Sequence, residues 1–388
     1  MKIETMRIID RLVGTPVCKL LGVLAPVLSQ KPEGDTVILC KFFGIGSICL
    51  SYPLIEELKR QNKEVTYLTF KSNEAMVRGL GVEQCYTIDP SSPVRFLGDM
   101  VRVIRDLRRL GPAVFLNLEF FSRFAAIMSL LSGAPVRAGF HMLHLPVGNL
   151  YSHRANLNVY RSIFENYMNV GMAAGAVSSF QPLESYLETF PYHPKSEPLN
   201  GISGDYIVLN AESSETIQAL RAWPASAWVD LIKRLRNACP DHSLVMVGTD
   251  AGAEIYNEIA AHLSEDTNII SLVGRTSFAE FSVVLCNASL VISVDSGPLH
   301  LSAFMKRNTV GLFGPETPVL YGYQLPWVRN IHKNLICSPC LALYDAKKSV
   351  LDCRDNQCMK QISPGDVMVE VNDLMSQGAE FQKHFAKR

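Results

Sequence analysis

The sequence predicts two α/β domains, each with a mostly parallel β-sheet covered by helices. Short apolar, β-prone runs alternate with segments of helical periodicity, and this alternation occurs twice along the chain. A stretch rich in proline and glycine at residues 183–204 separates the two series and predicts a linker. The length of 388 residues exceeds what one hydrophobic core commonly supports, which also favours two domains.

Hydrophobic periodicity sets the predicted elements of each half. In the first half we expect strands at residues 36–42, 64–70, 85–88 and 113–118, and helices at 50–60, 94–110 and 123–131. In the second half we expect strands at 206–209, 243–247, 269–272, 290–294 and 309–313, and helices at 225–238, 253–263, 278–286, 299–304 and 365–385. The predicted organisation is an N-terminal segment 1–34, a first domain 35–190, a linker 191–204, a second domain 205–364 and a C-terminal helix 365–388.

Residues 6–28 form an amphipathic segment outside this alternation. Apolar residues recur there at helical spacing while charged residues lie mostly on the other side, although Gly14 and Pro16 would interrupt a helix. A helix in the membrane interface and a helix packed on the first domain both fit. The sequence has no run of ~20 apolar residues and no recognisable secretory signal. We therefore expect a cytoplasmic protein, with peripheral membrane contact through residues 6–28 under the first interpretation.

The formal net charge of zero argues against a nucleic-acid partner, which normally needs a basic surface. It places no such limit on a small anionic ligand, which needs only a few local donors. Six of the ten cysteines are scattered singly, mostly within apolar runs, and are typical of buried thiols in a reducing compartment.

The most informative segment for function follows the predicted strand 290–294. That strand delivers Asp295 to its carboxyl end, Ser296 and Gly297 form a turn, and Pro298 suits the first turn of the next helix. The free N–H groups and positive dipole end of such a helix can hold a diphosphate. His300 would lie one turn along and could face the same pocket, although an ordinary helix cap with a core histidine also fits.

Residues 295–303 and 310–318 resemble the signature of glycosyltransferase family 9, the ADP-heptose:lipopolysaccharide heptosyltransferases and their relatives. The resemblance implies a GT-B fold: two Rossmann-like domains facing a cleft, with the C-terminal helix returning to the first domain. It implies that Asp295, Ser296, Gly297 and His300 approach the diphosphate and sugar of the donor. In this family the sugar is transferred by direct displacement at the anomeric carbon, and catalysis generally needs no metal.

Further matches extend the resemblance over roughly residues 35–375. Arg221, in the run 221–224, matches a basic residue that binds phosphate in this family, and a guanidinium suits the charge on a departing diphosphate. Asn210 lies at a strand end that faces the donor in the family. Residues 247–248 and 272–276, including Gly248, Val273 and Gly274, match segments that enclose the nucleotide base.

The first half departs from the family at its proposed general base. Gly44 and Gly46 match the glycine turn on the acceptor side, but the aspartate that usually follows is Ser47 here. A serine hydroxyl without a partner base cannot accept a proton at neutral pH. Glu119, after the predicted strand 113–118, is our candidate replacement, and the alternative for Glu119 is a pair with Arg123 four residues on.

Four cysteines cluster near the C-terminus with the spacing Cys337-x2-Cys340-x12-Cys353-x4-Cys358. In a cytoplasmic protein this spacing favours a structural zinc or iron site over disulfides.

From these observations the expected function is a glycosyltransferase that moves a sugar, by resemblance heptose from ADP-heptose, onto a glycan or lipid-linked saccharide such as lipopolysaccharide. The catalytic candidates are Glu119, Ser47, Arg221 and Asp295. The alternative is a sugar-nucleotide-binding protein whose catalysis is impaired by the loss of the usual aspartate at Ser47.

Overall fold

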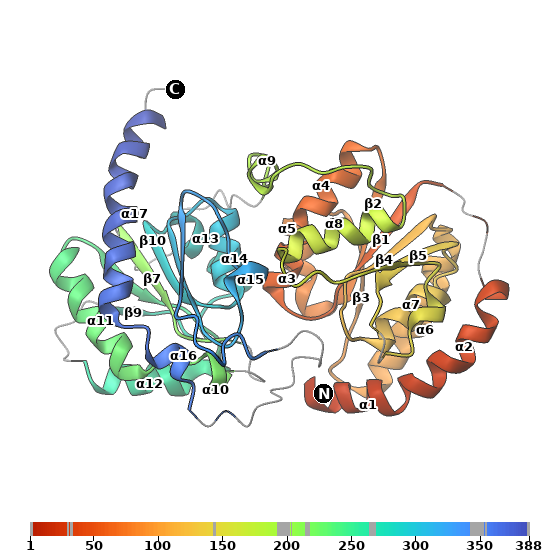
Figure 1. Ribbon diagram of the computed structural model, residues 1–388, viewed down its shortest axis with the longest axis horizontal. Helices are drawn as coiled ribbons and strands as arrows, with labels where there is room; N and C mark the ends of the chain where they lie inside the picture. The colour runs from red at the N-terminus through yellow and green to blue at the C-terminus, as the bar shows by residue number, and fades with distance from the viewer. Residues whose placement is uncertain are drawn as a thin grey trace. The chain divides into compact units, whose positions relative to one another are not determined.

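The computed structural model describes residues 3–28, 31, 34–142, 145–191, 202, 204–213, 218–263, 269–341, 353 and 355–385. The chain divides into two compact units, Met1–Pro191 and Tyr192–Arg388. Each unit is built around one sheet with helices on it (Figure 1). The predicted α/β class is therefore confirmed. Most of the predicted linker, residues 192–201 and 203, lies outside the described residues.

The first unit holds a six-stranded sheet in the order β3-β2-β1-β4-β5-β6, with every pair parallel. Its central strand β1 pairs through Cys40 with Leu68 of β2 and with Asn117 of β4. This register brings the segments that follow β1 and β4 to the same edge. The strands are β1 (Thr36–Cys40), β2 (Glu64–Phe70), β3 (Gln84–Ile88), β4 (Val114–Asn117), β5 (Val136–Phe140) and β6 (His153–Ala155).

Helices cover both faces of this sheet, as parallel strands require. They are α1 (Ile3–Leu12), α2 (Gly14–Leu28), α3 (Ile45–Cys49), α4 (Tyr52–Arg60), α5 (Glu74–Gly79), α6 (Pro93–Leu110), α7 (Arg123–Leu131), α8 (Ile163–Ala173) and α9 (Leu183–Leu187), with short 3₁₀ turns η1 (Lys71–Asn73) and η2 (Gly148–Leu150). Ile38, Leu68 and Phe115 of three neighbouring strands are fully buried and form the centre of one core cluster.

The second unit repeats this plan with a parallel sheet in the order β12-β11-β10-β7-β8-β9. The strands are β7 (Tyr206–Asn210), β8 (Ser243–Met246), β9 (Ile269–Ser271), β10 (Leu290–Val294), β11 (Thr309–Phe313) and β12 (Val328–His332). The helices are α10 (Gln218–Arg221), α11 (Ala225–Ala238), α12 (Ala253–Ala261), α13 (Phe278–Asn287), α14 (Gly297–Phe304), α15 (Pro318–Tyr321), α16 (Gln357–Lys360) and α17 (Pro364–Phe385), with the 3₁₀ turn η4 (Asp250–Gly252).

The C-terminal helix α17 packs on the second unit. Its contacts are with α11, β11 and β12. Val367, Val371 and Leu374 are buried in the core cluster of the second unit. Arg329 of β12 also pairs with Asp373, with 2.6 Å between Nη2 and Oδ2. The apolar stripe and the ion pair thus hold the helix on the strands that precede it.

The N-terminal segment folds as two helices, α1 and α2, which meet at Val13. They pack on α7 and η2 of the first unit. Within the described chain, no helix has both the length and the hydropathy needed to cross a membrane.

Candidate functional site

Three strand ends meet at one edge of the second sheet. Strands β7, β10 and β11 are neighbours, with Ser293 opposite Asn210 and Val294 opposite Leu312. Strand β10 ends directly before Asp295, as the sequence predicts. Because the strands are parallel, Asn210, Asp295 and the loop that carries Glu316 all follow carboxyl ends, where open α/β sheets bind their ligands.

A buried arginine links these segments. The Nη2 atom of Arg221 lies 2.9 Å from Oδ2 of Asp295 and 2.8 Å from Oε1 of Glu316. Its Nη1 donates to the backbone carbonyl of Asp295 at 2.5 Å. Burial alone would lower the pKa of Arg221, but the two carboxylates outweigh burial and raise it. The guanidinium is therefore charged and fixed between two anions.

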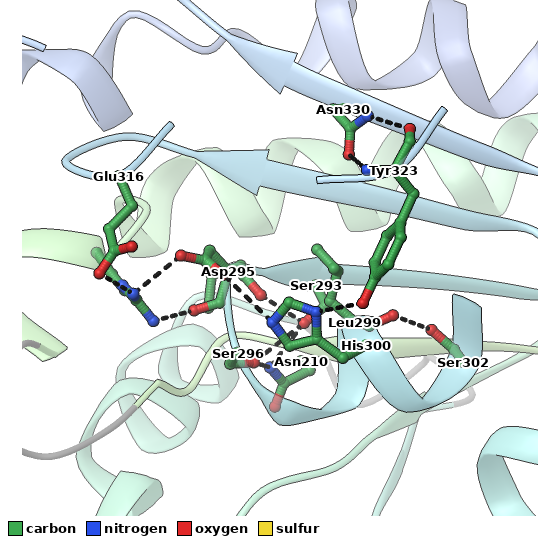
Figure 2. A network of polar contacts seen from close by, with 12 residues as sticks. Asn210, Ser293, Asp295, Ser296, Leu299, His300, Ser302, Glu316, Tyr323 and Asn330 are labelled. Atoms are coloured by element: carbon green, nitrogen blue, oxygen red, sulfur yellow. Dashed lines mark hydrogen bonds and ion pairs between the residues drawn. The ribbon is translucent and has the colours of Figure 1, made fainter. Parts of the chain in front are cut away.

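His300 extends this network on the other side of Asp295 (Figure 2). It lies on α14, one turn after the strand, with its Nε2 atom 3.7 Å from Oδ1 of Asp295. Its Nδ1 atom is hydrogen-bonded to the hydroxyl of Tyr323 at 2.6 Å. Asn330 in turn fixes the backbone of Tyr323, donating to its carbonyl and accepting from its N–H. The structure thus brings Arg221, Asp295 and His300 together, as the sequence analysis expects.

Asn210 holds the start of α14. Its side-chain amide donates to the hydroxyls of Ser293 at 3.0 Å and Ser296 at 2.8 Å. Ser296 is the N-cap residue in an extended conformation, yet its side chain forms no cap hydrogen bond. Pro298 lies in the first turn. The predicted strand–turn–helix unit is therefore present, with Gly297 as its first helical residue.

The other donor-side candidates form a second group at the ends of β8 and β9. Gly274 donates its N–H to the carbonyl of Gly248 at 3.0 Å, so these two turns are joined, and Val273 precedes Gly274. A side chain at Gly248 would lie 2.8 Å from a carboxylate oxygen of Glu212. Glu212 also accepts hydrogen bonds from the N–H and hydroxyl of Thr249, each at 2.5 Å. Close approach thus favours glycine at position 248, and Gly274 has a φ of 66°, which also favours glycine.

In the first unit, Glu119 lies beneath the glycine turn. Its Oε2 atom is 2.9 Å from Nζ of Lys41, and its Oε1 atom accepts the N–H groups of Phe42 at 2.7 Å and Phe43 at 3.0 Å. Glu119 is 7% and Lys41 3% exposed, so this ion pair is buried. Three donors thus contact the carboxylate, and these contacts hold the turn. The contacts therefore favour a positioning role for Glu119.

The alternative pair between Glu119 and Arg123 is wrong. Arg123 pairs with Asp10 of α1, with 3.4 Å between Nη1 and Oδ2. Ser47 lies in α3, and its hydroxyl would be 3.3 Å from a side chain added at Gly44. Gly44 has a φ of 84°, which requires glycine, and Gly46 is buried within α3.

The four clustered cysteines form no disulfide bonds. Burial raises the pKa of Cys358 to about 11, with further contributions from Cys340, Cys353 and Cys337. Burial also raises the pKa of Cys340, again with contributions from two of the other thiols. The part of the chain with assigned structure contains no group of three or more His, Cys, Asp or Glu side chains arranged to hold a metal ion. Residues 342–352, between the two pairs, lie outside that part.

Comparison with known proteins identifies the family from a large part of the chain. The model of glycosyltransferase family 9 (heptosyltransferase) matches residues 102–351, which include the Arg221–Asp295–His300 network. The chain belongs to glycosyltransferase family 9. This membership was expected from the motifs at residues 295–303 and 310–318.

Individual similarities are modest. The chain is 26% identical over 174 residues to lipooligosaccharide heptosyltransferase 2 of Campylobacter jejuni, which covers 43% of this chain and 51% of that relative. The match therefore spans about half the length of the relative. A family 9 glycosyltransferase structure from Veillonella parvula has a TM-score of 0.70 at 17% identity, covering 90% of this chain and 99% of the other.

The structure of ADP-heptose lps heptosyltransferase II from E. coli has a TM-score of 0.66 at 18% identity and covers 89% of this chain and 99% of the other. At this identity the likeness concerns the fold, and it confirms the expected GT-B type.

Four residues that contact the candidates or their neighbours were not themselves sequence candidates: Glu316, Tyr323 and Glu212 in the second unit and Lys41 in the first. Glu316 lies within the quoted motif 310–318, so its acidic side chain beside Gly314 and Pro315 was an available signal. The contacts of Tyr323 and Lys41 depend on which strands are neighbours, and their local sequence contains no such signal.

We predict that Glu119→Gln destabilises the protein. The amide would face the ammonium of Lys41 and leave that buried charge unpaired, which typically costs about 3–5 kcal/mol. The measurement is the free energy of unfolding in urea.

Glu74→Gln is the matched control, because Glu74 forms an exposed pair with Arg78 and should cost less than about 1 kcal/mol. If the two variants were equally stable, the Lys41–Glu119 pair would not hold the turn.

Proposed function

We propose that this protein is a glycosyltransferase that moves heptose from ADP-heptose onto a saccharide acceptor of the lipopolysaccharide type. The observation that carries the proposal is the buried network of Arg221, Asp295, Glu316 and His300 beside the start of α14. Membership in family 9 supports the reaction class, and the names of the C. jejuni and E. coli proteins support heptose as the sugar.

In this proposal the diphosphate of the donor binds at the start of α14. The N–H groups of the first turn and the helix dipole favour an anion there. Arg221 is one cation between two carboxylates, so its charge is largely compensated before a donor arrives. Its main role is then to fix Asp295 and the turn, while Asn210 orients Ser296. The turns at Gly248, Val273 and Gly274 would enclose the nucleotide base.

The acceptor hydroxyl needs a base to remove its proton as the anomeric carbon is attacked. Glu119 remains the proposed replacement for the missing aspartate only if the acceptor displaces Lys41 from it. Glycine turn residues Gly44 and Gly46 would then face the acceptor. A lipid-linked acceptor would place the protein at the cytoplasmic face of a membrane.

The first test is titration calorimetry of the purified protein with ADP-heptose, ADP and UDP-sugars. We expect ADP-heptose and ADP to bind, and binding to weaken at least tenfold, about 1.4 kcal/mol, in Arg221→Ala and Asp295→Ala. Arg221→Lys keeps the positive charge, but an ammonium group lacks the forked geometry that contacts both carboxylates. The donor affinity of this variant should therefore lie between those of the wild type and Arg221→Ala.

Arg234→Ala is the matched control, because Arg234 is a half-exposed arginine paired with Asp230 in the same unit. Thermal unfolding of each variant shows whether it is folded. Absence of adenine-nucleotide binding in folded wild-type protein would remove the heptose-donor assignment.

Donor turnover distinguishes a transferase from a protein that only binds the sugar nucleotide. The non-catalytic alternative rests on Ser47 alone, and the comparisons lend it no support. We expect wild-type turnover that falls in Glu119→Gln beyond what its stability loss explains. A wild-type protein that is inert, with turnover gained in Ser47→Asp, would instead favour the alternative.

We also propose a structural zinc or iron bound by Cys337, Cys340, Cys353 and Cys358. Burial raises the pKa values of Cys340 and Cys358, with further contributions from the nearby thiols Cys337 and Cys353, and a metal ion would stabilise thiolates that burial disfavours. Elemental analysis of the purified protein should find zinc or iron, and Cys358→Ser should lower that content. Cys239→Ser is the control, since Cys239 is a half-buried thiol outside the cluster. Metal-free folded protein would contradict the proposal.

A further inference from the structure

Helix α2 faces the first unit with its small residues. Cys18 and Ala25 are buried, at 1% and 6% exposure. A side chain added at Gly14 would lie 2.8 Å from Cβ of Arg123, and one added at Gly22 would lie 3.1 Å from Cβ of Asn149. The helix can therefore approach α7 and η2 closely only because this side is made of small residues.

The large aliphatic residues of the same helix pair face away from the unit. Leu12 and Leu20 are each 66% exposed and Val23 is 78% exposed. An amphipathic helix on a globular protein normally buries such residues. The outward set of α1 and α2, with the residue between them, is Ile8, Ile9, Leu12, Val13, Leu20, Val23 and Leu24.

Helix α6 presents a second exposed apolar row beside this pair. Val94, Leu97 and Val101 are 82%, 54% and 63% exposed. Met6 of α1 and Phe96 of α6 pack against the same core cluster, and both helices contact α7. Figure 1 shows α1 and α2, in red, along the side of the first unit that carries α6 and α7. We call the exposed sides of α1, α2 and α6 the outer face.

The three helices of the outer face are basic as a set, although the whole chain is neutral. The three helices contain eight basic residues, Arg7, Arg11, Lys19, Arg95, Arg102, Arg105, Arg108 and Arg109, and four acidic ones, Glu4, Asp10, Asp99 and Asp106, which gives a net charge of +4.

Three of the acidic residues are engaged within the first unit, among them Asp106, which pairs with Arg105. Asp10 accepts the N–H groups of Arg123 and Phe124, and Asp99 accepts that of Asp89 and pairs with Arg102. A hollow of about 550 Å³ on α6 is lined by Val101, Ile104, Arg105, Arg108 and Arg109.

We propose that the outer face docks on an anionic phospholipid bilayer. Aliphatic side chains of α1, α2 and α6 would enter the boundary between headgroups and acyl chains, while arginines and Lys19 contact lipid phosphates. Asp10 anchors α1 to the start of α7, so that docking would hold the whole first unit at the membrane. The proposal is independent of which sugar is transferred.

Charge decides between a bilayer and a second copy of this chain. In a two-fold contact the same surface meets itself, so two sets of these helices, each with a net charge of +4, would be opposed. An anionic bilayer instead complements both the cations and the aliphatic residues.

The test is co-sedimentation of the full chain with vesicles of phosphatidylcholine and of an equimolar mixture of phosphatidylcholine and phosphatidylglycerol. We expect binding to the mixed vesicles that weakens as salt is added, and little binding to phosphatidylcholine alone. Leu20→Gln/Val23→Gln should weaken binding at least about tenfold, since part of the apolar anchor is lost. Arg105→Gln/Arg109→Gln should weaken it roughly 30-fold, which corresponds to about 1 kcal/mol for each cation.

Val369→Gln is the matched control, because Val369 lies on α17 of the second unit and is 66% exposed, the same as Leu20. All substituted residues are exposed, so thermal unfolding should be unchanged. Absence of vesicle binding by folded wild-type protein, or equal binding by the variants, would overturn the proposal. A dimer in ultracentrifugation that Leu20→Gln/Val23→Gln dissociates, without vesicle binding, would assign the face to self-association instead.

Discussion

The candidate site depends on one buried charge, the guanidinium of Arg221. It contacts Asp295 after β10 and Glu316 after β11, and it donates to the backbone that leads into α14. Removing three charged groups from water is costly, so such a cluster persists only where each group finds its partners. The arginine therefore fixes the relative positions of two strand ends and the helix start. The shape of the turn at the start of α14 follows from that constraint.

The first unit uses the same device with different residues. Lys41 follows β1, Glu119 follows β4, and their ion pair is buried beneath the glycine turn. In both units a buried cation and a carboxylate join neighbouring parallel strands where their carboxyl ends meet. A carboxylate in this position is occupied by structural contacts. A ligand at the carboxyl edge of either sheet would therefore contact the backbone donors that these ion pairs hold in place. It could use the carboxylates themselves only by breaking the ion pairs.

Local patterns predicted the alternation of strands and helices, but not the neighbours of each strand. The strand before Asp295 and the helix after it were predictable because apolar periodicity and Pro298 are local signals. The ion-pair partner of Glu119 was not predictable from local sequence, because the i,i+4 spacing of a helix favours Arg123. Lys41 comes close only because β1 pairs with β4 and sets Cys40 opposite Asn117. That pairing depends on strand order, which requires the whole fold.

The N-terminal helices show a second limit of periodicity. An apolar repeat predicts which residues share a face, and the usual assumption is that this face is buried. Helix α2 also carries a second repeat, of small residues at positions 14, 18, 22 and 25. This small-residue side, and not the aliphatic one, packs on the first unit. The small residues let the backbone of α2 lie close to the first unit. The larger aliphatic residues on the other side leave more apolar area exposed, which another contact could bury. Which repeat is buried depends on the shape of α7 and η2, and therefore on tertiary structure.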